Sequence, residues 1–231
     1  MRTIIIGDIH GCSGALRSLM AKIQPDQNKD RLILLGDLFD RGPDSWGVYR
    51  QVQALADLYG DRFVLLRGNH EDYLLQQKLS LTQRFVWERV GRGATVSSFK
   101  AHGERMEDSA EWIRAHAVLW YRGDGFQCVH AGLKVDPIEA NDTYTMIHDH
   151  GVVMENQYAG PLTIVGHIAL DAPTWFPGEG QPIEKLPEGG AQVLPKRGII
   201  CIDTGCGKGG RLTAMVIEDG HYSLASVGEE G

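Results

Sequence analysis

The chain has 231 residues, of which 42% are hydrophobic, so it is long and apolar enough to bury a sizeable core. Thirty acidic and 23 basic residues give a formal net charge of -7, and no dense cluster of Lys or Arg indicates a nucleic-acid face. No apolar stretch approaches the roughly 20 residues of a membrane span, and the amino terminus lacks a signal-peptide pattern. We therefore expect a cytoplasmic protein whose partners include neither a nucleic acid nor a membrane.

Three short apolar runs near the amino terminus each end in glycine: TIIIG at 3–7, RLILLG at 31–36 and RFVLLRG at 62–68. Such runs are typical of strands that are covered on both faces. Between them, residues 13–23 and 44–59 carry apolar side chains at helical spacing, and Ser13 and Asp44 are the expected N-caps. The alternation of strand and helix predicts parallel strands, whose carboxyl ends gather at one edge of a sheet.

The later part of the chain returns to strand patterns after a helical stretch. Hairpins are predicted at 117–130 and 211–227, where Gly and Asp mark the turns, and further strands at 162–166 and 198–203.

Two segments stand apart from this pattern. Residues 70–117 have helical periodicity and are expected to form a flank. Residues 171–198 are rich in Pro and Gly and are expected to form a long irregular loop. With no internal repeat and no second core, residues 1–231 are predicted to form a single domain.

Polar side chains that can bind metal or transfer protons follow the predicted strands: Asp8, His10, Asp37, Asp40, Arg41, Asn69, His70, His130 and His167. A sheet would gather them in one crevice, where unpartnered Asp and His side chains are desolvated at a cost of several kcal/mol. Divalent metal ions would remove that penalty. Carboxylate, amide and imidazole ligands suit Mn²⁺, Fe or Zn²⁺, and there are too many for one tetrahedral ion with an open position. The sequence therefore predicts two metal ions.

The motifs GDIHG, GDLFDRG and GNHE, followed in order by HAG, GH and IDTG, resemble the bacterial branch of the phosphoprotein phosphatase family within the calcineurin-like metallophosphoesterases. The resemblance extends over roughly residues 3–217. It implies an α/β fold in which two mixed β-sheets pack as a sandwich flanked by helices, in four layers αββα. It also implies two divalent metal ions, with Mn²⁺ as the first choice and Fe or Zn²⁺ as alternatives.

The resemblance implies a ligand set for each metal. The ligands of the first would be Asp8, His10 and Asp37, and those of the second would be Asp37, which bridges, with Asn69, His130 and His167.

The remaining roles concern phosphate and protons. His70 would be the general acid, oriented by Asp40, while Arg41 and Asn69 would bind phosphate oxygens. A hydroxide that bridges the two metals would attack phosphorus, because metal ions lower the pKa of bound water towards about 7.

The leading prediction is a dinuclear-metal phosphomonoesterase that acts as a protein serine/threonine phosphatase, with a phosphorylated protein or a small phosphoester as substrate. The alternative is a symmetrical diadenosine tetraphosphatase, whose sequences share GDxHGC and the late IDTGC stretch. Those enzymes tend to have Ala-Arg-Gly where this chain has Asp40-Arg41-Gly42, and Asp in place of Glu71, and both differences favour the phosphatase. An alternative of another class is a non-catalytic phosphate-binding module, against which the complete ligand set and His70 argue.

Family members generally carry a second phosphate-binding Arg between HAG and GH, whereas residues 131–167 contain no Arg. Lys134 and Arg92 are the candidate replacements, although a Lys lacks the bidentate fork of Arg. A solvated surface charge is the simpler interpretation of both.

Three further features are interpreted as structural. The HDH sequence at 148–150 lies away from a clear strand end and is expected to be a solvated loop. The GCGKGGR sequence at 205–211 lacks P-loop spacing and is expected to be a tight turn. Asp203 is expected to have a structural role without direct catalysis.

Overall fold

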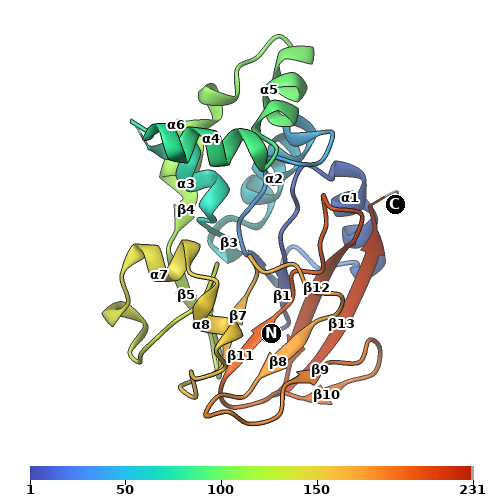
Figure 1. Ribbon diagram of the computed structural model, residues 1–231. Helices are drawn as coiled ribbons and strands as arrows, with labels where there is room; N and C mark the ends of the chain where they lie inside the picture. The colour runs from blue at the N-terminus through green and yellow to red at the C-terminus, as the bar shows by residue number, and fades with distance from the viewer. Residues whose placement is uncertain (77, 230–231) are drawn as a thin grey trace.

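The computed structural model describes residues 1–76 and 78–229, and it has two sheets packed face to face with helices outside them (Figure 1). The first sheet contains, in spatial order, β10 (Gln192–Val193), β13 (His221–Gly228), β12 (Arg211–Glu218), β1 (Thr3–Ile6), β2 (Arg31–Leu34), β3 (Phe63–Leu66) and β4 (Ala117–Val118). The second contains β5 (Trp120–Arg122), β6 (Gln127–Val129), β7 (Thr163–Val165), β11 (Ile199–Cys201), β8 (Thr174–Phe176) and β9 (Glu184–Lys185). The predicted αββα fold is confirmed.

Strand β1 shows how the layers stack. Ile4 and Ile6 point to one face and pack in the core beneath helices α1 (Ser13–Ile23) and α2 (Ser45–Tyr59). Ile5 points to the other face and packs in the core between the two sheets. All three side chains are fully buried, and each such burial stabilises the fold by about 1.5–3 kcal/mol. A continuous apolar run is therefore what a strand between two cores requires.

The two expected N-caps have different outcomes. The Asp44 carboxylate accepts a hydrogen bond from Gly47 N at 2.9 Å and caps α2, as predicted. Ser13 is already the first residue of α1, and the preceding Cys12 occupies the cap position. The Ser13 hydroxyl donates to Asp44 instead, so the prediction for Ser13 is wrong and the residue joins the starts of both helices.

The remaining helices lie at the end and on the outer face of the sandwich. They are the α-helices α3 (Asn69–Leu75), α4 (Leu81–Arg89), α5 (Arg92–Ala101), α6 (Ala110–His116), α7 (Thr143–His148) and α8 (Gly151–Met154), and the 3₁₀ helices η1 (Gly60–Arg62), η2 (Met106–Ser109) and η3 (Ile138–Ala140). Helix α5 packs on α2, and α3 packs on α6. Helices α7 and α8 cover the outer face of the second sheet through Met146, Ile147 and Val153. Among the residues the structure describes, no helix has the length and apolar character needed to cross a membrane.

The strand predictions hold except at Ala117 and Val118, which pair with β3 in the first sheet and not within the predicted hairpin, and in residues 171–198. The antiparallel pairs β5–β6 and β12–β13 are the two expected hairpins. Residues 171–198, expected to be irregular, contain β8, β9 and β10, of which β8 pairs with β11 and β10 pairs with β13. Strands of two or three residues are too short to display a periodic pattern, so composition alone suggested a loop.

Strands β1, β2 and β3 run parallel in the first sheet, and β6 and β7 run parallel in the second. Their carboxyl ends face the region between α3, α7 and the loop before β12 (Figure 1). The segments that follow these five strands are therefore brought together.

Candidate active site

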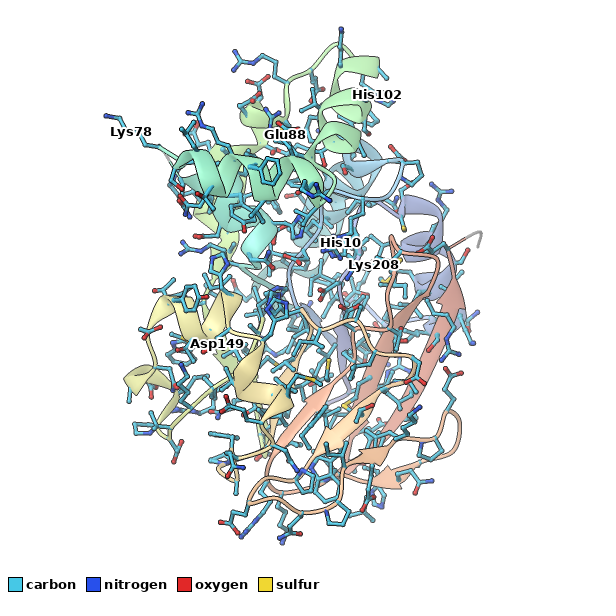
Figure 2. All side chains as sticks on the ribbon, viewed as in Figure 1. His10, Lys78, Glu88, His102, Asp149 and Lys208 are labelled. Carbon is cyan, nitrogen blue, oxygen red and sulfur yellow. The ribbon has the colours of Figure 1, made fainter. Side chains whose placement is uncertain are left out.

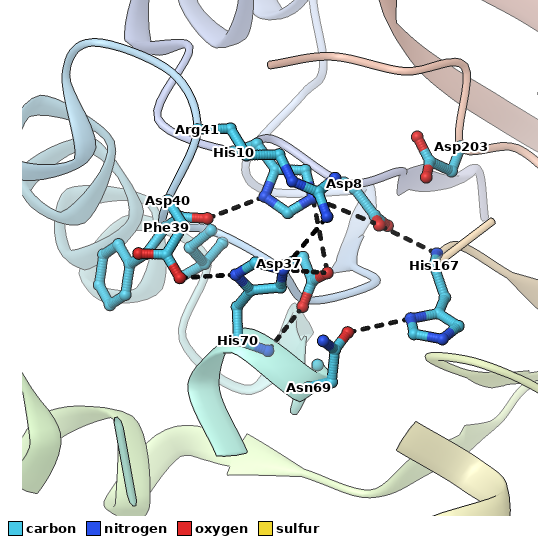
Figure 3. A network of polar contacts seen from close by, with 12 residues as sticks. Asp8, His10, Asp37, Phe39, Asp40, Arg41, Asn69, His70, His167 and Asp203 are labelled. Carbon is cyan, nitrogen blue, oxygen red and sulfur yellow. Dashed lines mark hydrogen bonds and ion pairs between the residues drawn. The ribbon is translucent and has the colours of Figure 1, made fainter. Parts of the chain in front are cut away.

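The segments after five strands deliver their polar side chains to one cluster (Figure 3). Its members are Asp8 and His10 after β1, Asp37 after β2, Asn69 and His70 after β3, His130 after β6 and His167 after β7. Asp8, His10, Asp37, His70 and His130 are at most 2% exposed. The residues predicted from the strand ends are thus collected at one buried place.

Asp37 lies at the centre of the cluster. Its Oδ2 atom is 3.5 Å from His10 Nε2 and 3.8 Å from His70 Nε2, and its Oδ1 atom is 3.4 Å from His130 Nε2. Two groups of possible ligand atoms result, His10–Asp37–His70 and Asp37–His130–His167, each within 4.8 Å. Because Asp37 belongs to both, its carboxylate could bridge two ions.

Asn69 and Asp8 complete the two groups. Asn69 Oδ1 lies 2.9 Å from His167 Nδ1 and 3.2 Å from His130 Nε2, on the side of the second group. Asp8 Oδ2 lies 4.0 Å from His10 Nε2 on the side of the first, and it accepts a hydrogen bond from His167 N at 2.9 Å. The two groups therefore meet through Asp8 as well as through Asp37.

Backbone carbonyls orient the imidazole rings. His10 Nδ1 lies 2.8 Å from Phe39 O, and His130 Nδ1 lies 2.8 Å from Leu35 O. A carbonyl can only accept, so in each ring Nδ1 donates and the lone pair of Nε2 is left facing the cluster. A metal-binding histidine is typically fixed in this way by a hydrogen bond from its other nitrogen.

The loops that carry these side chains have unusual backbone conformations. His10, Asp37, Asp40, Arg41 and His167 all have positive φ angles, between 44° and 70°. Such conformations cost about 1–3 kcal/mol each in residues other than glycine and concentrate at functional sites. The neighbouring Gly166 is required for a steric reason, because a Cβ atom there would collide with Asp8 Oδ1. The local strain places the side chains and is offset by the buried sheets beneath them.

Burial and neighbouring charges shift the pKa values of the cluster in both directions: those of His10 and His167 fall, whereas for His130 burial is outweighed by the nearby Asp37 carboxylate, which raises the pKa to about 10. Burial, assisted by the neighbouring His130, lowers the pKa of His167 to about 2, and burial also lowers the pKa of His10 well below its usual value. Neutral imidazole is the form that binds metal. Burial, with the nearby carboxylate of Asp203, raises the pKa of Asp8 far above its usual value, so that this carboxyl group favours its protonated form until a cation binds.

The donor set fits divalent metal ions. Asp8 Oδ1 is buried and has no hydrogen-bond partner among the described residues. The Nε2 lone pair of His130 and the Oδ1 atom of Asn69 face each other at 3.2 Å, which is costly in a buried site unless a cation is present. The residues present therefore fit two ions that share Asp37.

His70 and Asp40 form a pair at the cavity wall. His70 Nδ1 lies 2.6 Å from Asp40 Oδ2, which also accepts from Trp87 Nε1 at 2.7 Å, and Thr95 Oγ1 donates to Asp40 Oδ1 at 2.6 Å. These contacts fix the imidazole so that Nε2 faces the cavity, 3.4 Å from Arg41 Nη2. A ring held in this orientation can exchange a proton at Nε2.

Glu71 has a structural role that the sequence did not reveal. Its fully buried carboxylate accepts hydrogen bonds from Asp37 N, Leu38 N and Gly68 N at 2.7–3.0 Å. It thereby ties the loop after β2 to the start of α3. Only the tertiary structure brings its acceptor oxygens to these three donors.

A cavity of about 590 Å³ opens beside the cluster. Arg41 and Lys208 supply its cationic lining, and Tyr73, Tyr144 and His148 supply aromatic lining. Lys208 and His10 project near each other in the view of Figure 2, and a Cβ atom on Gly207, which precedes Lys208, would lie 2.6 Å from His10 Cβ. The loop at 205–211, predicted only as a tight turn, therefore forms part of the site.

The two candidate replacements for the second phosphate-binding Arg lie elsewhere. Lys134 Nζ pairs with Asp149 Oδ2 at 2.7 Å, and Arg92 Nη1 pairs with Glu88 Oε1 at 2.6 Å. Neither lines the cavity, which agrees with their interpretation as surface charges. Lys208 is the cation that accompanies Arg41.

The solvated-loop prediction for HDH at 148–150 is wrong. His148 and His150 both line the cavity, and the His150 ring lies 4.1 Å from that of His167. His167 Nε2 is also 3.3 Å from His148 O. These contacts join α7 to the loop after β7, and no residue spacing in the sequence predicts them.

Fold and cluster together define a metal-dependent phosphoesterase, with paired metal-binding groups at the carboxyl ends of strands in a two-sheet sandwich. The family profile of the calcineurin-like phosphoesterases matches residues 1–194, and the chain belongs to this family. It is 26% identical to a protein named "Bis(5'-nucleosyl)-tetraphosphatase, symmetrical" from Serratia proteamaculans (strain 568), over 96% of this chain and 93% of the relative. A protein of the same name from Pseudomonas fluorescens (strain SBW25) is 25% identical over 95% and 93% of the respective chains.

The same fold occurs in solved structures. The chain superimposes on a crystal structure described as a putative diadenosine tetraphosphatase with a TM-score of 0.62, at 22% identity, over 98% of this chain and 93% of the other.

The prediction of a protein serine/threonine phosphatase is wrong. Relatives that match nearly the whole chain carry the tetraphosphatase name. Asp40 and Glu71 were the two residues that favoured the phosphatase. In the structure Asp40 holds the His70 ring and Glu71 accepts backbone hydrogen bonds, so both have structural contacts that do not depend on the substrate. Their identity reflects how the loops are held.

Proposed function

We propose that this protein hydrolyses dinucleoside polyphosphates and cleaves diadenosine tetraphosphate symmetrically. The observation that carries the proposal is the likeness, over nearly the whole chain, to proteins named as symmetrical tetraphosphatases. The cavity supports it, because cationic and aromatic side chains line the same space of about 590 Å³. That volume lies in the range of sites that enclose molecules of nucleotide size.

Arg41 and Lys208 bind the phosphate chain in this proposal. The Arg41 guanidinium is held in the site between two imidazole nitrogens, with Nη1 3.0 Å from His10 Nε2 and Nη2 3.4 Å from His70 Nε2. Its planar fork suits two oxygens of one phosphate, whereas the Lys208 ammonium acts as a point charge. The two cations attract a polyanion to a protein whose net charge is -7.

The residues that would hold the two metals are those that the family resemblance implies, namely Asp8, His10, Asp37, Asn69, His130 and His167. Two divalent ions bound there would polarise the phosphate and lower the pKa of water towards about 7. Asn69, through its side-chain amide at the start of α3, would help to hold the second metal and would bind a phosphate oxygen.

His70 supplies the proton. In symmetrical cleavage one water adds to the phosphorus of the second phosphate from one adenosine. The bridging P–O bond to the third phosphate then breaks, and diadenosine tetraphosphate and water give two molecules of ADP. The leaving ADP oxygen accepts the proton from His70 Nε2, while Asp40 keeps the ring oriented from Nδ1 at 2.6 Å.

The experiment is a product analysis with a substrate panel. The metal-loaded protein is incubated with diadenosine tetraphosphate and, separately, with a phosphoserine peptide. The proposal predicts ADP as the only nucleotide product and a much lower rate on the peptide. Formation of ATP with AMP, or no cleavage of the dinucleotide while simple phosphate esters are hydrolysed, would refute it.

A further inference from the structure

Tyr144 is an exposed aromatic side chain of the cavity. It lies on α7, lines the cavity and is 65% exposed. A large apolar ring left in solvent at the rim of a polar cavity is a candidate contact for a ligand.

Neighbouring side chains hold the Tyr144 ring in place. One face stacks on His148, with ring centroids 5.4 Å apart and planes 18° apart. His148 Nε2 lies 3.2 Å from Asp72 Oδ2, and Asp72 Oδ1 pairs with Arg67 Nη2 at 3.1 Å. This chain of contacts joins α7 to α3 and limits the motion of the aromatic pair. An aromatic ring that is already ordered loses little entropy when a ligand stacks on it.

The aromatic side chains form a row that leads away from the reacting centre. Tyr73 lies 6.3 Å from the His70 ring and 5.9 Å from the His148 ring, measured between centroids. Tyr144 follows His148 at the outer end. Arg41 lies on the inner side, next to Asp40 and with Nη1 3.0 Å from His10 Nε2, and Lys208 lies on the loop before β12, whose Gly207 packs against His10. The cavity thus has a cationic inner part and an aromatic outer part.

We propose that Tyr144 is a stacking surface for the base of a nucleotide whose phosphates lie against Arg41 and the metal-binding cluster. This inference rests on the proposed function and names the element that recognises the nucleoside. Only a ligand with phosphates at one end and a flat ring at the other matches both parts of the cavity. Any base can stack on a tyrosine ring, and a purine stacks more strongly than a pyrimidine because its ring surface is larger. His148 is a positioning residue that acts through Tyr144.

The experiment measures inhibition of p-nitrophenyl phosphate hydrolysis, so that it does not depend on cleavage of a dinucleotide. ADP and inorganic pyrophosphate are compared as inhibitors of the metal-loaded wild type, Tyr144→Ala and Tyr144→Phe, with divalent cation in excess. We expect Tyr144→Ala to raise the inhibition constant of ADP about 5- to 150-fold, the range that base stacking supplies. The constant for pyrophosphate, which has no base, should stay unchanged. Tyr144→Phe retains the ring and should match the wild type.

Two results would overturn the inference: an unchanged ADP constant in Tyr144→Ala, or equal weakening of ADP and pyrophosphate binding. If Tyr144→Ala weakens ADP binding selectively but the wild type does not cleave diadenosine tetraphosphate, the contact between Tyr144 and the base is supported and the proposed function is refuted. A wild type that cleaves the dinucleotide while Tyr144→Ala binds ADP normally would sustain the proposed function and refute the base contact.

Discussion

Replacement of His70 by Asn tests the proton-transfer step. Asp40 would keep its hydrogen bonds from Trp87 and Thr95, so the buried carboxylate stays partnered and the fold is retained. The shorter side chain lacks an Nε2 atom that could reach the cavity. A positioned general acid contributes about 10²- to 10⁴-fold to a rate.

The size of the loss depends on the leaving group. For diadenosine tetraphosphate the leaving group is a terminal phosphate with a pKa of about 6, so His70→Asn should cost about 10²-fold in kcat. For phenyl phosphate the leaving phenol has a pKa of about 10, so the loss should approach about 10⁴-fold.

The assay is steady-state kinetics of wild type and His70→Asn on both substrates, with metal content measured on the same preparations. Metal content should be unchanged in His70→Asn and reduced in the matched variant Asp37→Asn, which alters the carboxylate shared by both groups. Near-wild-type rates, or equal losses on the two substrates, would refute a proton-donor role for His70.

Three further predictions concern binding and stability. Lys208→Gln should raise KM for diadenosine tetraphosphate about tenfold, since it removes a charged contact worth about 1.5 kcal/mol. Lys134→Gln is the control, because Lys134 pairs with Asp149 outside the cavity. Equal KM values in both variants would count against a phosphate contact of Lys208. Glu71→Gln should lower the free energy of unfolding in urea by about 1–3 kcal/mol, because an amide nitrogen would then face backbone N–H donors; an unchanged midpoint would contradict this. Removal of divalent metal by a chelator should lower the thermal midpoint and added Mn²⁺ should restore it, whereas a midpoint indifferent to both would exclude a metal that stabilises the fold.

The sequence predicted the inner part of the site because that part follows strand ends. Asp8, Asp37 and His130 each come directly after an apolar run, and parallel strands bring such positions to one edge. The alternation of Ile4, Ile5 and Ile6 between two cores was likewise implicit in an uninterrupted apolar strand.

The outer part of the site could not be predicted in this way. Lys208, Tyr144 and His148 lie on a loop and a six-residue helix whose place over the strands depends on tertiary packing. The substrate class was mistaken for a related reason. Asp40 and Glu71 were interpreted as markers of substrate, whereas their hydrogen bonds serve the loops that hold His70 and Asp37.

The central claim is symmetrical cleavage of a phosphoanhydride, and hydrolysis of diadenosine tetraphosphate in oxygen-labelled water tests it most directly. The account predicts that ADP is the only nucleotide product and that one label enters the terminal phosphate of one ADP for every two formed. Labelled ATP or AMP, or release of inorganic phosphate as the primary product, would contradict it.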